Sequence, residues 1–166
     1  YLTVRVFEEG VTDENVERFL TDGGKLDLLV EECDNLAIKL KARERARALG
    51  IPVVMDTNDR GLLDVERFDR EPGRPLLHGL VRELDAAKIA GLDARERLRL
   101  FYSFLGGEEH VSTALRDSVK AIGKTLVGLP QLASDVHLGG ALVANAARRI
   151  LLGKLLGPSG FQRPVV

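Results

Sequence analysis

Carboxylate side chains follow two apolar segments of the sequence at the points where those segments end. Glu31, Glu32 and Asp34 follow the run LDLLV, and Asp56 and Asp59 follow IPVVM. If both runs are neighbouring parallel strands, their carboxyl ends meet at one edge of a sheet, where open α/β folds bind ligands. Carboxylates that close repel one another unless a cation, a proton or a basic side chain offsets them. Magnesium carried by a nucleotide would do so, because Mg²⁺ takes oxygen ligands and needs only one or two carboxylates.

A structural role accounts for the same carboxylates without a ligand. Asp34 or Asn35 can cap the helix that follows, because both residue types accept hydrogen bonds from the first turn. The other acids can be solvated charges at loop ends. Spacing alone leaves both interpretations open.

The elements that would hold these carboxylates alternate between strand and helix patterns. Residues 2–7, 26–32 and 51–55 are apolar or β-branched, as expected of strands. A helix capped by Thr12 or Asp13 separates the first two, and another helical segment separates the last two. This alternation predicts three parallel, neighbouring strands with right-handed crossovers. The predicted fold class is therefore α/β, with a Rossmann-like parallel sheet.

The second helix has an apolar stripe formed by Ile38, Ala42, Ala46 and Leu49, and Gly50 is expected to end it. Basic residues recur through its run KLKARERAR. We expect them on a solvated helix face rather than on a nucleic-acid patch, because this spacing spreads charge around the helix.

The second part of the chain reads differently. The stretch GLLDVERFDREPGRP is expected to be a charged surface segment. Helices are predicted over 84–107, with a break near Gly91 and a cap at Asp93, then over 111–126 and 131–156.

These patterns divide the chain into two parts. Residues 1–60 are expected to form the C-terminal part of a Rossmann-like sheet, and residues 61–166 a mostly helical extension that packs on it. Because the first residue is Tyr1, we expect the chain to be a fragment of a larger protein.

The stretch DLLVEECDN, followed by a helix and GIPVVM, resembles a segment of ThiF/MoeB-type adenylyltransferases, the bacterial relatives of ubiquitin-activating enzymes. Their segment reads aspartate, two apolar residues, D-x-x-D-N, and later G-I/V-P. The helix PQLASDVHLGGALVANAARRILLG is similar to the helix that closes that fold after a proline. The resemblance covers residues 1–60 and 130–156, and its most specific element is Cys33-Asp34-Asn35.

The resemblance implies an enzyme that binds Mg-ATP and adenylates the C-terminal carboxylate of a sulfur-carrier or ubiquitin-like protein, as in molybdopterin or thiamine biosynthesis. Asp34 matches the aspartate that faces the Mg-ATP phosphates, and Asn35 matches its neighbour. Lys39 takes the position of a basic residue that could touch phosphate, or it is a solvated helix charge. Asp56 and Asp59 complete the predicted nucleotide and magnesium site.

The chain also departs from this family. The Gly-rich loop, the ribose-binding acid and the phosphate-binding Arg and Lys should precede Tyr1, and Glu31 replaces the first aspartate of D-x-x-D. The sequence therefore assigns no catalytic residue. Two alternatives remain: a catalytically inactive binding or dimerisation module of a larger protein, or a fragment of an NAD-dependent oxidoreductase.

Composition limits the remaining functions. The net charge of -1 gives no electrostatic case for nucleic acid. Cys33 is the only cysteine, so an internal disulfide and a zinc site with two Cys pairs are excluded, and a reducing, cytoplasmic location is expected. Asp135 and several basic residues interrupt the helix at 131–156, so it is no membrane span. Its stripe of small residues predicts a homodimer, or contact with a missing N-terminal half; the stripe comprises Val136, Gly140, Val143, Ala147 and Ile150.

Overall fold

The computed structural model describes residues 2–81, 86–154 and 157–163. In that part of the chain a four-stranded sheet has the order β1 (Leu29–Val30), β2 (Val53–Asp56), β3 (Leu63–Glu66) and β4 (Gly160–Gln162). β1 and β2 are parallel, whereas β3 is antiparallel to both β2 and β4. The predicted α/β class is confirmed, but the sheet is mixed rather than parallel.

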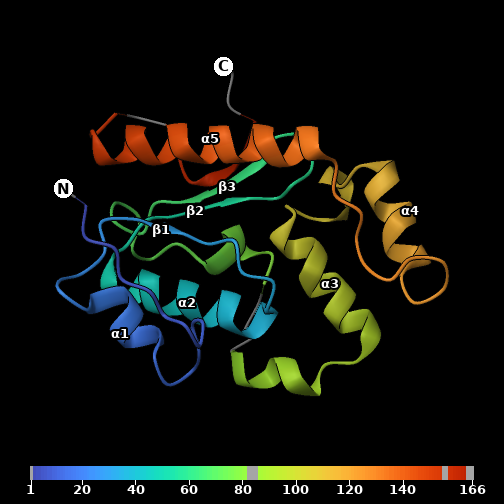
Figure 1. The fold of residues 1–166 in the computed structure, drawn as a ribbon, viewed down its shortest axis with the longest axis horizontal. Coiled ribbons are helices and arrows are strands. Elements are labelled where there is room, and N and C mark those ends of the chain that lie inside the picture. Colours follow the sequence, from blue (N-terminus) through green and yellow to red (C-terminus); the bar gives the residue numbers. More distant parts are fainter. Residues whose placement is uncertain (1, 82–85, 155–156, 164–166) are drawn as a thin grey trace.

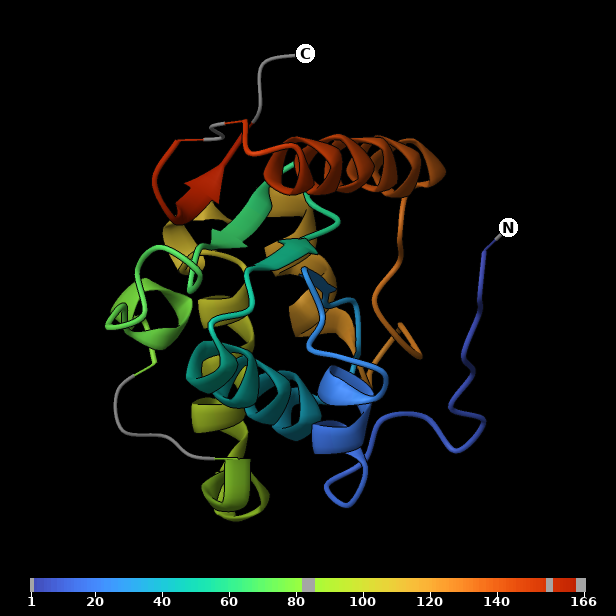
Figure 2. The same ribbon diagram turned by 90° about the vertical axis from the view of Figure 1, so that its left-hand side faces the viewer.

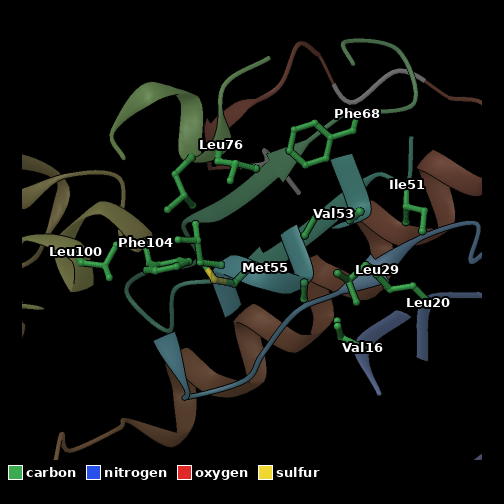
Figure 3. Close-up of a cluster of buried hydrophobic side chains, with 14 of the residues drawn as sticks. Val16, Leu20, Leu29, Ile51, Val53, Met55, Phe68, Leu76, Leu100 and Phe104 are labelled. Atoms are coloured by element: carbon green, nitrogen blue, oxygen red, sulfur yellow. The ribbon is translucent and has the colours of Figure 1, made fainter. Parts of the chain in front are cut away.

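Helices cover both faces of the sheet. α1 (Val16–Thr21) and α2 (Leu36–Leu49) lie on one side of it, and α5 (Ala133–Leu151) lies on the other (Figure 1). Successive residues of β2 divide between the two layers, since Val53 and Met55 join the core beneath α2 and Val54 packs under α5. Figure 3 shows the larger core, which extends from Phe104 at one side to Leu20 at the other.

Local signals set the ends of α2, as predicted. Asn35 Oδ1 accepts hydrogen bonds from the N–H groups of Ala37 at 3.0 Å and Ile38 at 3.2 Å. Gly50 ends the helix with φ 64°, a left-handed conformation that costs glycine little. Between the two residues proposed as the cap, the structure selects Asn35 over Asp34.

Two other helix starts test the same reasoning. Asp93 and Glu96 form a capping box at the start of α3 (Ala94–Phe104), which confirms Asp93 as a cap. The cap position of α1 is Asn15, so the prediction of Thr12 or Asp13 is wrong. Asn15 Oδ1 instead accepts from the Thr12 N–H at 2.7 Å and stabilises the turn before the helix.

Residues 2–7 do not form a strand, although their pattern predicts one. Leu2, Val4 and Val6 are exposed, and the segment begins away from the sheet (Figure 2) and contacts the molecule through Arg5 at Asp22 and Phe7 at Phe19 of α1. A strand needs a hydrogen-bonding neighbour, and none of the described strands lies beside this segment. Of the three predicted parallel strands, only the second and third are confirmed as neighbours, at Leu29–Val30 and Val53–Asp56.

β3 lies in the first part of the segment 61–75, for which a charged surface was predicted; that prediction is wrong for residues 61–68, which are buried, and holds for residues 69–75, which are exposed or half-buried. All residues of β3 are buried. Leu63 and Val65 belong to the core under α5, whereas Asp64 and Glu66 point to the α2 side and bond to Arg43. The alternation of a strand is present in the sequence, but with charged rather than neutral polar residues on one face.

The rest of the second part is helical over most of its described residues. Its elements are η1 (Leu76–Gly79), η2 (Ala86–Gly91), α3, η3 (Glu108–His110), α4 (Thr113–Ala121) and α5. The predicted helical positions 84–85 and 155–156 lie outside the described residues. Because β3 and β4 also come from this part, the sheet extends across the predicted boundary at residue 60.

α5 covers β2 and β3 with a face that differs from the predicted stripe. Val143 and Ile150 are buried as expected, but Val136 and Gly140 are exposed. The buried positions are Gly139, Leu142, Val143, Ala146 and Ile150. Since the sheet covers this face, the small residues of α5 no longer argue for a dimer interface. None of the helices in the described ranges combines the length and apolar character needed to cross a membrane.

Candidate functional site

A solvent-open crevice lies beyond the carboxyl ends of β1 and β2. We call it the acidic crevice, because carboxylates from both strand ends line one wall. The facing wall is mainly apolar and comes from α3, α4 and the segment before α5. The crevice occupies the place where open α/β sheets bind ligands. Its polar lining includes Glu32, Asp34, Lys39, Asp56, Thr57 and Asn58, and its apolar lining includes Phe101, Phe104, Leu105, Leu115, Leu129 and Pro130.

The loop between β1 and α2 is fixed at both of its ends. Glu31 Oε1 accepts a hydrogen bond from the Cys33 N–H at 2.9 Å, and Cys33 Sγ accepts one from the Asn35 N–H at 3.3 Å. Asn35 in turn caps α2. These bonds place Asp34 at the crevice with an exposed side chain. A carboxylate held in this way is available to a ligand without a rearrangement of the loop.

Asp56 is a buried carboxylate at the end of β2, with 7% of its surface exposed. Among the described residues, its Oδ1 has no hydrogen-bond partner. Burial raises the pKa of Asp56 against the effect of neighbouring N–H groups, and the charge of Asp135 adds to the rise. α5 accommodates this carboxylate only because residue 139 is glycine, since a Cβ there would overlap it.

Glu32 connects the two strand ends. Its Oε1 accepts a hydrogen bond from the Asp56 N–H at 2.8 Å, although the residue as a whole is exposed. Loss of hydration raises the pKa of Glu32 to about 7, against the opposing effects of the Asp56 N–H and of Lys39. The acidic crevice therefore gains negative charge as the pH rises through neutrality.

Lys39 is the only Lys, Arg or His among the described residues that line the crevice. Its Nζ is 2.9 Å from Oε1 and 2.8 Å from Oε2 of Glu31. Both side chains are buried. In this arrangement Lys39 neutralises Glu31, and the carboxylates of Glu32, Asp34 and Asp56 have no cation of their own in the crevice.

Asp59 and Asn35 have structural partners instead. Asp59 does not line the crevice; its Oδ2 accepts from the Ser112 N–H at 2.8 Å and its Oδ1 lies 3.4 Å from Arg60 Nε. The Asn35 side chain is used as the cap of α2. The structure thus brings Asp34, Lys39 and Asp56 together in the crevice and leaves Asn35 and Asp59 outside its lining.

A second group of charged side chains lies between α2 and the sheet, and sequence reasoning missed it. Arg43 is fully buried; its Nη1 bonds to Glu66 and, at 2.6 Å, to Asp64 Oδ2. Its Nη2 is 3.4 Å from Glu31 Oε2. We call Glu31, Lys39, Arg43, Asp64 and Glu66 the buried ion cluster. The prediction that the basic residues of α2 share a solvated face is wrong for Lys39 and Arg43, which point inward from successive turns.

A signal for this cluster is present in the sequence. Lys39 and Arg43 are four residues apart on a helix, and Asp64 and Glu66 are two apart on a strand, so each pair shares one face. Opposite charges with matching periodicities would have indicated buried pairing between the two elements.

The carboxylates of the cluster outnumber its two permanent cations. Burial acts to raise the pKa of Asp64, but the Arg43 guanidinium and the bonded His78 hold this pKa below its ordinary value. Burial raises the pKa of Glu66, which Arg43 opposes only in part. Glu66 is therefore the carboxyl group of this pair that takes a proton first.

The donor atoms of the crevice suit a cation that arrives with its own ligands. In the described ranges, no group of three or more His, Cys, Asp or Glu side chains is arranged to hold a metal ion. Mg²⁺ bound to nucleotide phosphates needs only one or two carboxylates from the protein. Asp34 provides exposed hard oxygen atoms of that kind, whereas Asp56 adds negative charge from a carboxylate that is buried against Gly139 of α5 and whose Oδ1 has no partner in the described part of the chain.

Comparisons with known proteins give one informative likeness. No family model and no solved structure matches the chain. The chain is similar to a Mycobacterium tuberculosis (strain CDC 1551 / Oshkosh) protein named uncharacterized protein MT1398, with 46% identity over 156 residues. The match covers 94% of this chain but 21% of the relative, so the chain spans about a fifth of that protein's length.

Proposed function

We propose that this chain forms the acidic part of the nucleotide site in an ATP-dependent adenylyltransferase of the ThiF/MoeB type. The complete enzyme would activate the C-terminal carboxylate of a sulfur-carrier or ubiquitin-like protein. The supporting observation is the acidic crevice itself: Asp34 of the family-like motif lies beyond the carboxyl ends of two parallel strands, in one crevice with Asp56.

The residues of the crevice have separate roles in this proposal. Asp34, whose loop is fixed by Glu31 and Asn35, faces the magnesium that accompanies the phosphates. Asp56 adds a second negative charge from the end of β2, where its carboxylate is buried against α5. The apolar wall, which includes Phe104 and Leu115, lowers the local dielectric constant and strengthens these charge interactions. ATP supplies the adenylyl group that is transferred to the carrier carboxylate, with pyrophosphate as the leaving group.

The crevice does not provide everything that this reaction needs. Adenylyl transfer depends on fixed cations at the phosphates, where negative charge develops. Lys39, the cation among the described lining residues, is paired with Glu31. We therefore propose that further cationic groups come from other parts of the complete protein, and that the isolated chain has no adenylyltransferase activity.

Exchange of labelled pyrophosphate into ATP tests this function. The complete protein that carries this chain should catalyse exchange when a thiamine-type or molybdopterin-type sulfur-carrier protein is added, and not when that carrier lacks its C-terminal residues. Asp34→Asn should abolish the exchange, and Asp22→Asn, an exposed change outside the motif and the crevice, should not. Absence of exchange with both carriers would contradict the proposed reaction.

A further inference from the structure

Lys39 joins the acidic crevice to the buried ion cluster, because it lines the first and pairs within the second. Its side chain is 11% exposed. Phe104, which also lines the crevice, has its ring centre 5.6 Å from Lys39 Nζ and 5.5 Å from Arg43 Cζ. The ammonium group therefore lies at the boundary between the two regions, on a flexible side chain with several rotatable bonds.

Glu31 has a second cation that it uses only weakly. Its Oε2 is 2.8 Å from Lys39 Nζ but 3.4 Å from Arg43 Nη2, whereas charged hydrogen bonds of this kind are usually about 2.7–2.9 Å long. If Lys39 left, Arg43 could close this distance, and the Cys33 N–H would still bond to Oε1. Glu31 would then not become an unpaired buried charge, which would be costly.

The charge of the crevice gives a reason for such a movement. Glu32, Asp34 and Asp56 repel the phosphates of a ligand, and the positive charge of Lys39 is offset by Glu31. A polyphosphate that draws Lys39 from Glu31 gains a cation that the empty crevice does not offer.

We propose that Glu31 is an exchangeable partner of Lys39. Glu31 holds Lys39 in the empty crevice and releases it to a polyphosphate ligand, while Arg43 takes over the Glu31 carboxylate. This inference rests on the proposed function for the identity of its ligand, a nucleotide, but the exchange itself requires only a polyphosphate. Glu31 acts here as a positioning residue, because its oxygens bond within the cluster and to the Cys33 N–H.

Binding of magnesium tripolyphosphate and Mg-ATP to the complete protein, measured by titration calorimetry, tests the proposal. Glu31→Gln should tighten binding by roughly tenfold, the low end of what a hydrogen bond to a charged group contributes. Lys39→Met should weaken binding, and Glu31→Gln should give no gain in the Lys39→Met background. If Glu31 had a purely structural role, Glu31→Gln would lower the affinity, because a disturbed loop would bind the ligand more weakly.

Two controls separate this effect from a general change in charge. Glu32→Gln removes the same charge from the crevice, so any gain that it gives should persist in the Lys39→Met background. Lys41→Met removes a cation of α2 that pairs with Asp13, away from the crevice, and should leave the affinity unchanged. If Glu31→Gln does not fold, the shorter Glu31→Asp should give a smaller gain in the same direction.

The outcomes distinguish this inference from the proposed function. No gain in either Glu31 variant, or a gain that survives without Lys39, would overturn the exchange, as would absence of polyphosphate binding in every variant. Tighter Mg-ATP binding that depends on Lys39, without pyrophosphate exchange, would leave the exchange intact and reject the adenylyltransferase.

Discussion

The buried ion cluster and the acidic crevice meet at Lys39, but they differ in whether their carboxylates are paired with basic side chains. In the cluster, Asp64 and Glu66 are buried against Arg43, and each has a charged hydrogen-bond partner. In the crevice, Asp34 and Asp56 have no cation beside them, and Asp56 Oδ1 has no partner among the described residues. The first arrangement pairs its carboxylates without a ligand, although Arg43 Nε has no hydrogen-bond partner among the described residues. The second leaves charges that a ligand with its own cation can satisfy, which is why we assign function to the crevice and stability to the cluster.

Removal of Arg43, the central cation of the buried ion cluster, should have the largest effect on stability. Arg43→Met leaves two buried carboxylates without their main partner, which should lower the free energy of unfolding by about 3–5 kcal/mol. Arg45→Met is the matched control on the same helix, because Arg45 makes an exposed pair with Glu17 and its loss should cost about 0–1 kcal/mol. Urea denaturation of both variants measures the difference. Equal costs would show that the cluster is no more important than a surface ion pair.

A smaller effect on stability should come from the contact between Gly139 of α5 and Asp56 of the acidic crevice. Gly139→Ala places a Cβ on the Asp56 carboxylate and should cost about 1–3 kcal/mol through overpacking. Gly140→Ala, one position along, has open space around its Cβ and should stabilise the helix by up to about 1 kcal/mol. Thermal and chemical denaturation compare the two.

Asp56→Ala provides the control for that contact. In an Asp56→Ala background the overlap disappears, so Gly139→Ala should become neutral or stabilising. If Gly139→Ala is as harmless as Gly140→Ala in the wild-type background, Asp56 does not pack against α5 in the way described.

The smallest effect should be a pH dependence that arises in the crevice. The pKa of Glu32 rises from its ordinary 4.5 to about 7 in the folded protein. Protonated Glu32 therefore stabilises the folded state. This contribution to stability is fully present below about pH 4.5 and is lost as the pH rises through about 7. Glu32→Gln should remove this decline, so its advantage over the wild type should grow across that range. Because the residue is exposed, screening should keep the change small.

Denaturation of both proteins between pH 4 and 8 measures this difference. Parallel curves for Glu32→Gln and the wild type would show that Glu32 titrates normally and that the crevice does not raise its pKa.

The sequence predicted those elements whose signals are local. The caps at Asn35 and Asp93 and the end at Gly50 follow from residue types that act on their immediate neighbours. The parallel pairing of β1 and β2, and hence the position of the crevice, follows from a strand–helix–strand order whose connections are short. These features could be predicted because few alternatives compete with them.

Non-local partners account for most of the errors; the cap of α1, which lies at Asn15 rather than at Thr12 or Asp13, is a local one. Residues 2–7 have the pattern of a strand but no described strand beside them. Asp64 looked solvated because its neutralising partner, Arg43, lies 21 residues earlier in the chain. Arg43 looked exposed for the same reason, whereas the partner of Lys39 is Glu31, a residue eight positions earlier in the chain. Burial of a charge depends on where its counterion lies in space, and one sequence does not specify that distance.

The affinity of the complete protein for Mg-ATP, measured by titration calorimetry, tests the proposed nucleotide site most directly. Asp34→Asn should weaken binding by roughly tenfold or more, in line with the contribution of a contact to a charged group. It should leave the apo stability nearly unchanged, because Asn35 rather than Asp34 caps α2. Asp22→Asn, an exposed change of the same kind outside the motif and the crevice, should bind like the wild type. Equal affinities of Asp34→Asn and Asp22→Asn would contradict a nucleotide site in the acidic crevice.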